Sequence, residues 1–105
     1  MNAAIVNVGS IHGHVTTAGR VDYVTPKTEL IGGPRALALD LADYGIRVNM
    51  ASPGAIDTPI LTYAWKKKAS NIDLGILKKR AGLQHPCGSI GDPKDGTNSI
   101  EFLRQ

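Results

Sequence analysis

Two short apolar runs on either side of a long helical pattern constrain the fold of this chain more than any other feature. Ala3–Val8 is rich in β-branched side chains and is interrupted only by Asn7, which is typical of a strand buried on both faces. Residues 46–52 form a second run of this kind, which Pro53 and Gly54 then end. A strand, a helix and a strand in this order predict a right-handed parallel crossover, and so an α/β fold.

The segment between the two runs, residues 23–43, has the periodicity of an amphipathic helix. Its apolar stripe includes Leu30, Leu37 and Leu41, which recur at helical spacing and therefore share one face. Gly45 follows where a residue in the left-handed conformation often ends a helix. The sequence therefore predicts one long helix that joins the two strands.

The rest of the chain is predicted to be loops and short helices. Residues 9–22 contain several glycines and small polar side chains, so we expect a loop there. Residues 61–69 and 74–81 have helical patterns. Asp92 and Pro93 are suited to the N-cap and the first position of a last helix.

The composition predicts a small globular domain. Apolar residues make up 42% and charged residues 20%, which is close to ordinary globular usage. The formal charge of +3 arises in residues 51–105, which contain eight basic and five acidic groups. Because only Tyr63 and Trp65 lie near this basic cluster, a solvated helix face explains it better than a nucleic-acid-binding surface. The cluster consists of Lys66, Lys67, Lys68, Lys78, Lys79 and Arg80.

Several other kinds of site are not expected. Cys87 is the only cysteine, so no intrachain disulfide can form. His12 and His14 lack a third ligand nearby, and we expect no metal site. No apolar run approaches the ~18 residues of a membrane span, and the first residues do not have the pattern of a secretory signal. We therefore expect no membrane partner and a cytoplasmic location.

Ser10, Tyr23 and Lys27 form the candidate catalytic set. If residues 23–27 are helical, Tyr23 and Lys27 project from one face, one turn apart. An ammonium near a phenol hydroxyl favours the phenolate and lowers the tyrosine pKa from about 10, which suits proton exchange near neutral pH. Ser10 adds a hydroxyl that can hydrogen-bond a substrate oxygen. By itself, however, a Tyr-x-x-x-Lys pattern more often marks a surface tyrosine beside a solvated lysine.

The surrounding sequence resembles the short-chain dehydrogenase/reductase family along nearly its whole length. AIVNVGSIHG is similar to the family's strand with the catalytic serine, and the tyrosine and lysine follow at the family's spacing. LIGGPRALALDLADYGIRVNMASPGAIDTP is similar to the helix and strand that lead to the family's Pro-Gly cofactor loop. HPCGSIGDPKDGTNSIEFL is similar to the segment that precedes the family's last strand.

The resemblance implies a Rossmann-like doubly wound parallel sheet and hydride transfer between NAD or NADP and a small carbonyl or alcohol. Tyr23 would exchange the proton, Lys27 would lower the pKa of Tyr23 and hold the nicotinamide ribose, and Ser10 would orient the substrate. The cofactor-binding residues that the resemblance implies are Tyr23, Lys27, Pro53, Gly54, Ile56 and Thr58.

Some segments of the family have no counterpart in this sequence. It contains no TGxxxGxG phosphate loop and no Asn-Asn-Ala-Gly segment. We therefore expect residues 1–105 to be a partial domain, the C-terminal half of a family member without its last strand. Residues 1–59 would carry the strand–helix–strand unit, the catalytic-type motif and the cofactor loop. Residues 60–105 would carry the substrate-loop-like and terminal helical region.

Two prolines bear on the geometry of this site. Pro26 costs about 3 kcal/mol if the helix has already begun before it. If the helix instead starts near Thr25, Tyr23 lies off the helix face that carries Lys27. Pro34 follows two glycines in mid-helix and adds a similar cost. The sequence therefore predicts a poorly specified helix, with Pro26 as the residue that could displace Tyr23.

Two classes of function stay open from the sequence. One is an oxidoreductase chain, impaired when isolated and completed by a homo-oligomer or a complementing chain. The other is a non-catalytic truncated remnant or an interaction module. Because two parallel strands and one helix leave a sheet face and a sheet edge uncovered, we expect a marginally folded chain with little dehydrogenase activity. Its uncovered apolar surface should favour self-association or a partner chain.

Overall fold

The structure, a computed structural model, describes residues 2–105, which fold into two compact units. The first unit contains the residues up to Pro53 together with Gly96–Gln105. The second unit contains Gly54–Asp95. The boundary between the compact units therefore lies after Pro53. The division of motifs after residue 59 stays a prediction.

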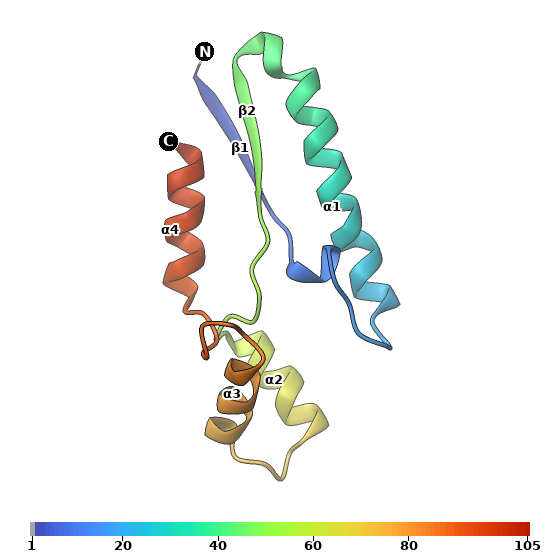
Figure 1. Ribbon diagram of the computed structural model, residues 1–105, viewed down its shortest axis with the longest axis vertical. Helices are drawn as coiled ribbons and strands as arrows, with labels where there is room; N and C mark the ends of the chain where they lie inside the picture. Colours follow the sequence, from blue (N-terminus) through green and yellow to red (C-terminus); the bar gives the residue numbers. More distant parts are fainter. Residues whose placement is uncertain (1) are drawn as a thin grey trace. The chain divides into compact units, whose positions relative to one another are not determined.

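The first unit is built around a parallel two-stranded sheet, as the sequence predicted (Figure 1). β1 (Ala3–Val8) pairs with β2 (Ile46–Ala51) along its whole length, and the last pair in the register is Val8 with Ala51. β2 ends at Ala51, one residue before the predicted end at Ser52. The fold class is therefore α/β with a parallel sheet, as predicted.

The helix α1 (Val21–Asp40) joins the two strands and contains both Pro26 and Pro34. Proline has no N–H, so Pro26 cannot donate to the carbonyl group of Asp22, one turn back. The helix nevertheless begins before Tyr23 and continues past both prolines. The predicted start at residue 23 was therefore two residues late, and the alternative start near Thr25 is wrong.

The helix α1 ends earlier than predicted and is followed by a tight turn. The helix ends at Asp40 rather than at residue 43, and a 3-10 turn, η2 (Ala42–Tyr44), follows. Gly45 then adopts a φ of 68°, in the left-handed region that glycine enters without a steric penalty. Its N–H donates to the carbonyl oxygen of Ala42 at 2.9 Å. The predicted glycine cap is therefore confirmed, although it ends the turn rather than α1 itself.

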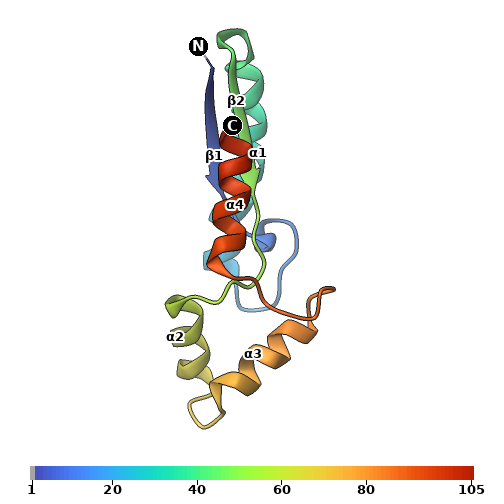
Figure 2. The ribbon, with the colours of Figure 1, turned by 90° about the vertical axis from the view of Figure 1, so that its left-hand side faces the viewer.

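The sheet of the first unit lies between two helices (Figures 1 and 2). α1 lies along one side, and α4 (Pro93–Arg104), which belongs to this unit from Gly96 onward, runs along the other. Arg47 of β2 donates hydrogen bonds to the carbonyl oxygens of Leu103 and Arg104, at 3.1 and 3.3 Å. These bonds pair acceptors that the last turn of a helix leaves free.

The second unit contains two short helices with defined N-caps. α2 (Pro59–Lys68) begins after Thr58, and α3 (Leu74–Leu83) begins after Asp73. Both helices were predicted, with boundaries within two residues. Asp92 accepts a hydrogen bond from the backbone N–H of Lys94 at 2.8 Å, as expected for the residue before α4.

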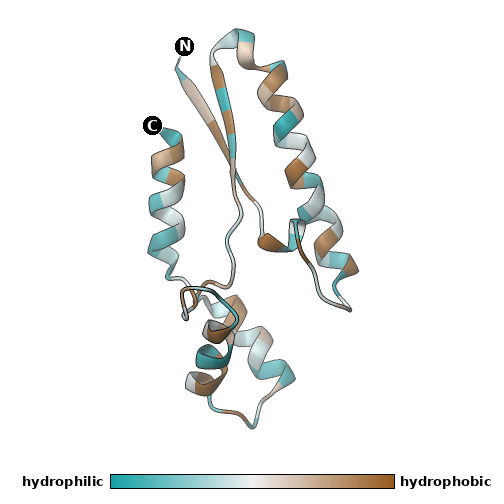
Figure 3. Ribbon diagram, viewed as in Figure 1, coloured by the Kyte–Doolittle hydropathy of each residue, from teal (hydrophilic) through white to brown (hydrophobic). Residues whose placement is uncertain are grey.

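Few apolar side chains are buried in either unit. Among the residues that the structure describes, Val48 is the only buried hydrophobic side chain, and it is 9% exposed. Val8 of β1 is 50% exposed and Leu39 of α1 is 80% exposed. Figure 3 shows apolar residues in brown along both strands and along α1. Because both faces of parallel sheets are normally covered, this apolar surface is available for further contacts.

The helices of the described region are also too short or too polar to be membrane spans. No helix within residues 2–105 is long and apolar enough to cross a bilayer.

Candidate active site

Ser10 lies directly after β1, at the carboxyl end of the sheet. On one side of it, the Gly9 N–H donates to the carbonyl oxygen of Ala51 at 2.8 Å, and on the other, the Ile11 N–H donates to that of Pro53 at 3.1 Å. These two bonds continue the strand pairing around Ser10, which is only 7% exposed. The serine is therefore held at the carboxyl end of the strands, where open α/β folds bind ligands.

The Ser10 hydroxyl also shapes the turn that follows. Its oxygen accepts a hydrogen bond from the His12 backbone N–H at 3.2 Å and so caps the 3-10 turn η1 (Ile11–Gly13). An oxygen that accepts this bond keeps its own O–H hydrogen free to donate to a ligand. The geometry thus fixes the position of the hydroxyl without using its donor.

Close packing brings the η1 turn onto α1. A Cβ placed on Gly13 would lie 2.6 Å from the Lys27 carbonyl oxygen, which is closer than real Cβ atoms approach. The Thr28 hydroxyl, which donates to the Val24 carbonyl oxygen at 2.8 Å, also lies 3.5 Å from the Gly13 carbonyl oxygen. Glycine is therefore required at position 13 for the Ser10 turn to meet the helix near Lys27.

Tyr23 is surrounded by basic side chains. The Lys27 ammonium nitrogen lies 5.6 Å from the centroid of the Tyr23 ring, and the Arg20 guanidinium carbon lies 4.7 Å from it. The His12 ring meets the Tyr23 ring edge-on, with centroids 5.7 Å apart and planes at 82°. Cations at such distances are attracted to the electron-rich face of an aromatic ring. The first unit therefore brings the η1 turn, Tyr23 and Lys27 together.

Two buried polar atoms near this region lack a partner among residues 2–105. They are Nδ1 of His12 and Oγ of Ser52. Ser52 follows β2, and its Oγ would lie 3.6 Å from a Cβ placed on Gly9, so it is close to the end of β1. Buried polar atoms in native proteins nearly always have partners.

In the second unit, Ile56 is held by a short parallel bridge to Gly91. Gly91 donates to the carbonyl oxygen of Ala55 at 2.9 Å and accepts from the N–H of Asp57 at 2.8 Å. In a parallel pair, this pattern leaves the N–H and C=O of the middle residue on the opposite side of the strand. Those two groups of Ile56 have no hydrogen-bond partner within residues 2–105.

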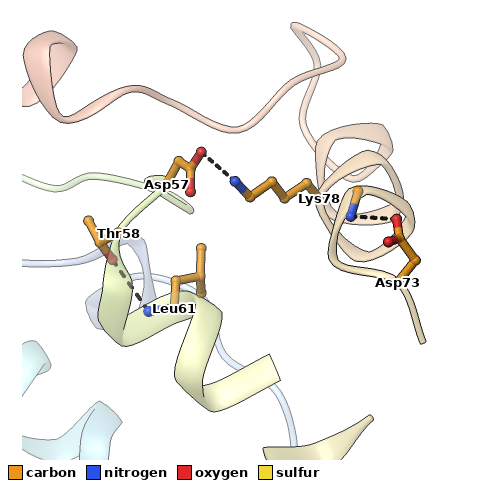
Figure 4. A network of polar contacts seen from close by, with 6 residues as sticks. Asp57, Thr58, Leu61, Asp73 and Lys78 are labelled. Carbon is orange, nitrogen blue, oxygen red and sulfur yellow. Dashed lines mark hydrogen bonds and ion pairs between the residues drawn. The ribbon is translucent and has the colours of Figure 1, made fainter. Parts of the chain in front are cut away.

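The residues after Ile56 are fixed by polar contacts (Figure 4). Thr58 caps α2, since its Oγ1 accepts from the N–H of Leu61 at 3.4 Å, and its hydroxyl hydrogen stays free to donate. The Asp57 carboxylate forms an ion pair with the Lys78 ammonium at 2.8 Å, which ties this segment to α3. The loop is thus held in place while one backbone edge and one hydroxyl hydrogen stay available.

His85 is a residue whose role the sequence did not predict. Its Nε2 accepts a hydrogen bond from the Ala55 N–H at 3.3 Å, and its Nδ1 lies 2.9 Å from the Ala81 carbonyl oxygen. Both contacts are satisfied when the proton is on Nδ1. His85 therefore links α3 to the loop before Ile56. Nothing in the local sequence indicates this contact, because the two residues are thirty positions apart.

The predicted site residues are divided between the two units. Ser10, Tyr23, Lys27 and Pro53 belong to the first unit. Gly54, Ile56 and Thr58 belong to the second unit. Arg20 was not among the predicted site residues, and its contact with Tyr23 could only have been suggested by its spacing of three on a helix.

The sequence as a whole matches a known family. The family profile described as "Enoyl-(Acyl carrier protein) reductase" matches residues 1–105. The chain belongs to the short-chain dehydrogenase/reductase family. A curated dehydrogenase of this family, the 2,5-dichloro-2,5-cyclohexadiene-1,4-diol dehydrogenase LinX of Sphingobium indicum, is 35% identical over 102 residues. That alignment covers 97% of this chain and 37% of LinX, so the chain spans little more than a third of this relative.

Solved structures agree with the family assignment. A short-chain dehydrogenase family protein from Francisella tularensis matches with a TM-score of 0.94 and 30% identity, over 99% of this chain and 44% of that one. The structure of ElxO with NADP bound matches with a TM-score of 0.80 and 28% identity, over 97% of this chain and 39% of that one. The fold of this chain is therefore that of part of a short-chain dehydrogenase/reductase, in the Rossmann-fold class.

Proposed function

We propose that this chain is the part of an NAD(P)-dependent oxidoreductase that contacts the substrate and the nicotinamide. The observation that carries the proposal is the arrangement on α1, where the Lys27 ammonium lies 5.6 Å from the Tyr23 ring centroid and the Ser10 turn packs against the same helix. Family membership supports it, because the relatives include dehydrogenases and reductases. The reaction would interconvert a small carbonyl compound and its alcohol.

Tyr23 would exchange a proton with the substrate oxygen, as a general acid in reduction and a general base in oxidation. The Lys27 ammonium, 5.6 Å from the centroid of the Tyr23 ring, would place a positive charge near the reacting groups. The Ser10 hydroxyl would donate to the substrate oxygen, since its acceptor capacity is already partly used by His12. All three roles belong to side chains that lie on α1 or in the segment between β1 and η1.

The residues present also fit the nicotinamide half of a cofactor. The unpaired N–H and C=O of Ile56 match the donor and acceptor of a carboxamide, and the free hydrogen of Thr58 supplies a further donor. Lys27 would hold the ribose hydroxyls. When bound, the cofactor supplies the hydride or accepts it. The printed sequence contains no Gly-rich loop for the pyrophosphate, so the residues described here account for the nicotinamide end alone.

A binding experiment on the chain itself tests this proposal. Nicotinamide mononucleotide, the half of the cofactor that these residues would contact, is titrated into the 105-residue chain and followed by NMR. We expect saturable shifts at Thr58 and Lys27, with a Kd on the order of 1 mM, because only half of the cofactor is bound. Thr58→Val and Lys27→Gln should each weaken binding, and the matched variant Lys67→Gln should not.

A complete absence of saturable binding would instead favour the second hypothesis, a non-catalytic remnant or interaction module. The exposure of Val8 and Leu39 is the observation that favours it, since monomeric proteins rarely expose large apolar patches without a partner. In that case Tyr23→Phe should leave every measurable property of the chain unchanged. The cytoplasmic location, the choice of NAD or NADP and the need for a homo-oligomer or complementing chain stay predictions.

A further inference from the structure

Arg20 has a side chain whose contacts the proposed function does not use. Its guanidinium carbon lies 4.7 Å from the centroid of the Tyr23 ring, and its backbone occupies the N-cap position of α1. The side chain makes no capping hydrogen bond. Within residues 2–105 it also forms no ion pair, since the ion pairs there are those of Lys78 and Arg104. A guanidinium carries five N–H donors, and those of Arg20 are left for other partners.

The charged groups around Tyr23 leave an excess of positive charge. Arg20 and Lys27 both lie within 6 Å of the ring centroid, and His12 meets the ring edge-on. The acidic residues near them on α1 are Asp22 and Glu29, both of which are exposed. Neither forms an ion pair with a side chain of the described region. Two cations without a paired carboxylate on one aromatic ring attract anions to that place.

We propose that Arg20 is a specificity-determining residue that binds an anionic group of the substrate, a carboxylate or a phosphate. The proposal rests on the proposed function in one respect, because it places the substrate carbonyl at the Tyr23 hydroxyl. The Arg20 guanidinium would then hold an anionic group attached close to that carbonyl. The substrates would be keto acids or phosphorylated ketones rather than neutral ketones.

The chemistry of arginine suits this role better than that of lysine. A guanidinium donates two parallel hydrogen bonds to a carboxylate or a phosphate. These bonds fix the orientation of the anion, and the positive charge attracts it. Its contact with the Tyr23 ring would hold the guanidinium in place before the substrate arrives, so that less freedom is lost on binding. Arg20 is only partly exposed, which makes a hydrogen bond to it stronger than one at a fully solvated side chain.

A structural role for Arg20 predicts a different set of results. If Arg20 serves only to stack on Tyr23 and to start α1, its loss should weaken the binding of neutral and anionic ligands alike. If it binds the anion, its loss should weaken anionic ligands only. The two roles are therefore separated by comparing ligands that differ in a single charged group.

The experiment uses the full chain and two matched pairs of probes at neutral pH. The first pair is pyruvate and methyl pyruvate, and the second is dihydroxyacetone phosphate and dihydroxyacetone. Binding is followed by NMR at the ring signals of Tyr23 and the Nε–H signal of Arg20. The variants are Arg20→Gln, which removes the charge, and Arg20→Lys, which keeps it without the bidentate geometry. Arg35→Gln is the control, because Arg35 is an exposed arginine on the same helix.

We expect the anionic member of at least one pair to bind roughly tenfold more tightly than its neutral partner, as for a charge-assisted hydrogen bond near the surface. Arg20→Gln should abolish that preference, Arg20→Lys should keep only part of it, and Arg35→Gln should keep all of it. The pair that shows the preference identifies the anion as a carboxylate or a phosphate. If Arg20→Gln fails to fold, as judged by its NMR spectrum, the Arg20→Lys result decides.

Three results would overturn the proposal. They are equal binding within both pairs, an equal loss for both members of a pair in Arg20→Gln, and a loss of preference in Arg35→Gln as large as in Arg20→Gln. Nicotinamide riboside, which has no phosphate for Arg20 to bind, is added to the same samples and separates this proposal from the proposed function. A charge preference that depends on Arg20 in a chain that does not bind the riboside would support the anion site and refute the oxidoreductase role.

Discussion

The two units of the chain are stabilised by different kinds of contact. In the first unit, a backbone ladder pairs β1 with β2, and the η1 turn packs closely on α1. In the second unit, single polar side chains fix the loop that contains Ile56, through the Asp57–Lys78 ion pair and the bond from Ala55 to His85. The first unit thus depends on repeated backbone pairing, and the second depends on a few individual hydrogen bonds.

This difference matters because the predicted site residues are distributed over both units. Ser10, Tyr23 and Lys27 are positioned by the sheet and by α1, so substitutions that weaken the sheet should disturb them. Thr58 and the Ile56 backbone are positioned by one short backbone bridge to Gly91, a cap and an ion pair. Each cap or exposed ion pair contributes about 1 kcal/mol or less. We therefore expect Ser10, Tyr23 and Lys27 to be held more firmly than Ile56 and Thr58.

The largest effect should come from Val48→Ala, at the centre of β2. Val48 is the one buried hydrophobic side chain among the described residues, and the removal of two methyl groups there should cost about 2 kcal/mol. Urea titration followed by circular dichroism measures the loss. Leu39→Ala is the control, because Leu39 is 80% exposed and its loss should change the free energy of unfolding by no more than about 0.5 kcal/mol. Equal losses in the two variants would show that β2 does not anchor the first unit.

A smaller effect is expected from Asp73→Ala, at the N-cap of α3. The Asp73 carboxylate accepts from the N–H groups of Gly75 and Ile76 at 2.9 and 3.3 Å, and loss of such a cap costs ~1 kcal/mol. Hydrogen exchange should accelerate at the amides of the first turn of α3. Asp73→Asn, which keeps an acceptor at the cap, should restore most of the protection. If the amides of β1 and β2 accelerated as much, the two units would not be stabilised separately.

His85→Phe should loosen the loop before Ile56 by a slightly smaller amount. The variant keeps an aromatic ring but removes the acceptor for the Ala55 N–H, and one such net hydrogen bond is worth roughly 0.5–1.5 kcal/mol. Hydrogen exchange at Ala55 should therefore accelerate by about tenfold or less. His14→Phe is the matched control, since His14 is exposed and has no side-chain hydrogen bond among the described residues. Unchanged exchange at Ala55 would show that His85 does not position this loop.

The same contrast explains how much of the structure the sequence predicted. The strands, the long helix and the parallel order follow from apolar periodicity, which repeats over many residues and tolerates single exceptions such as Pro26 and Pro34. The two strands, the helix between them and their parallel order were therefore predicted, apart from the ends of α1 and β2. The position of α4 along the other side of the sheet was not predicted, because that face was expected to be uncovered. The His85 contact was not predicted, because one hydrogen bond between residues thirty positions apart leaves no periodic signal. The approach of Arg20 to Tyr23 was missed for the related reason that many arginines lie three residues from an aromatic without touching it.

The smallest effect is expected at the exposed pair of Glu101 and Arg104 on α4. The Arg104 guanidinium donates to both carboxylate oxygens of Glu101, one of them at 2.6 Å. This hydrogen bond lowers the pKa of Glu101 below its ordinary value of 4.5 and raises that of Arg104. A lowered pKa in the folded state gives stability that is present above the ordinary pKa. That stability is lost as the pH falls through the lowered one.

Glu101→Gln should therefore differ from the original chain only slightly at neutral pH, and the difference should vanish in acid. NMR titration of the Glu101 carboxylate measures the pKa directly, and Arg104→Gln should return it toward its ordinary value. A midpoint unchanged by Arg104→Gln would show that the pair does not persist in solution. In that case Arg47, which donates to the carbonyl oxygens of Leu103 and Arg104, would be the side chain that holds the C-terminal end of α4 to the sheet. Even then the effect on overall stability should stay small, because pairs between solvated side chains are weakened by water and salt.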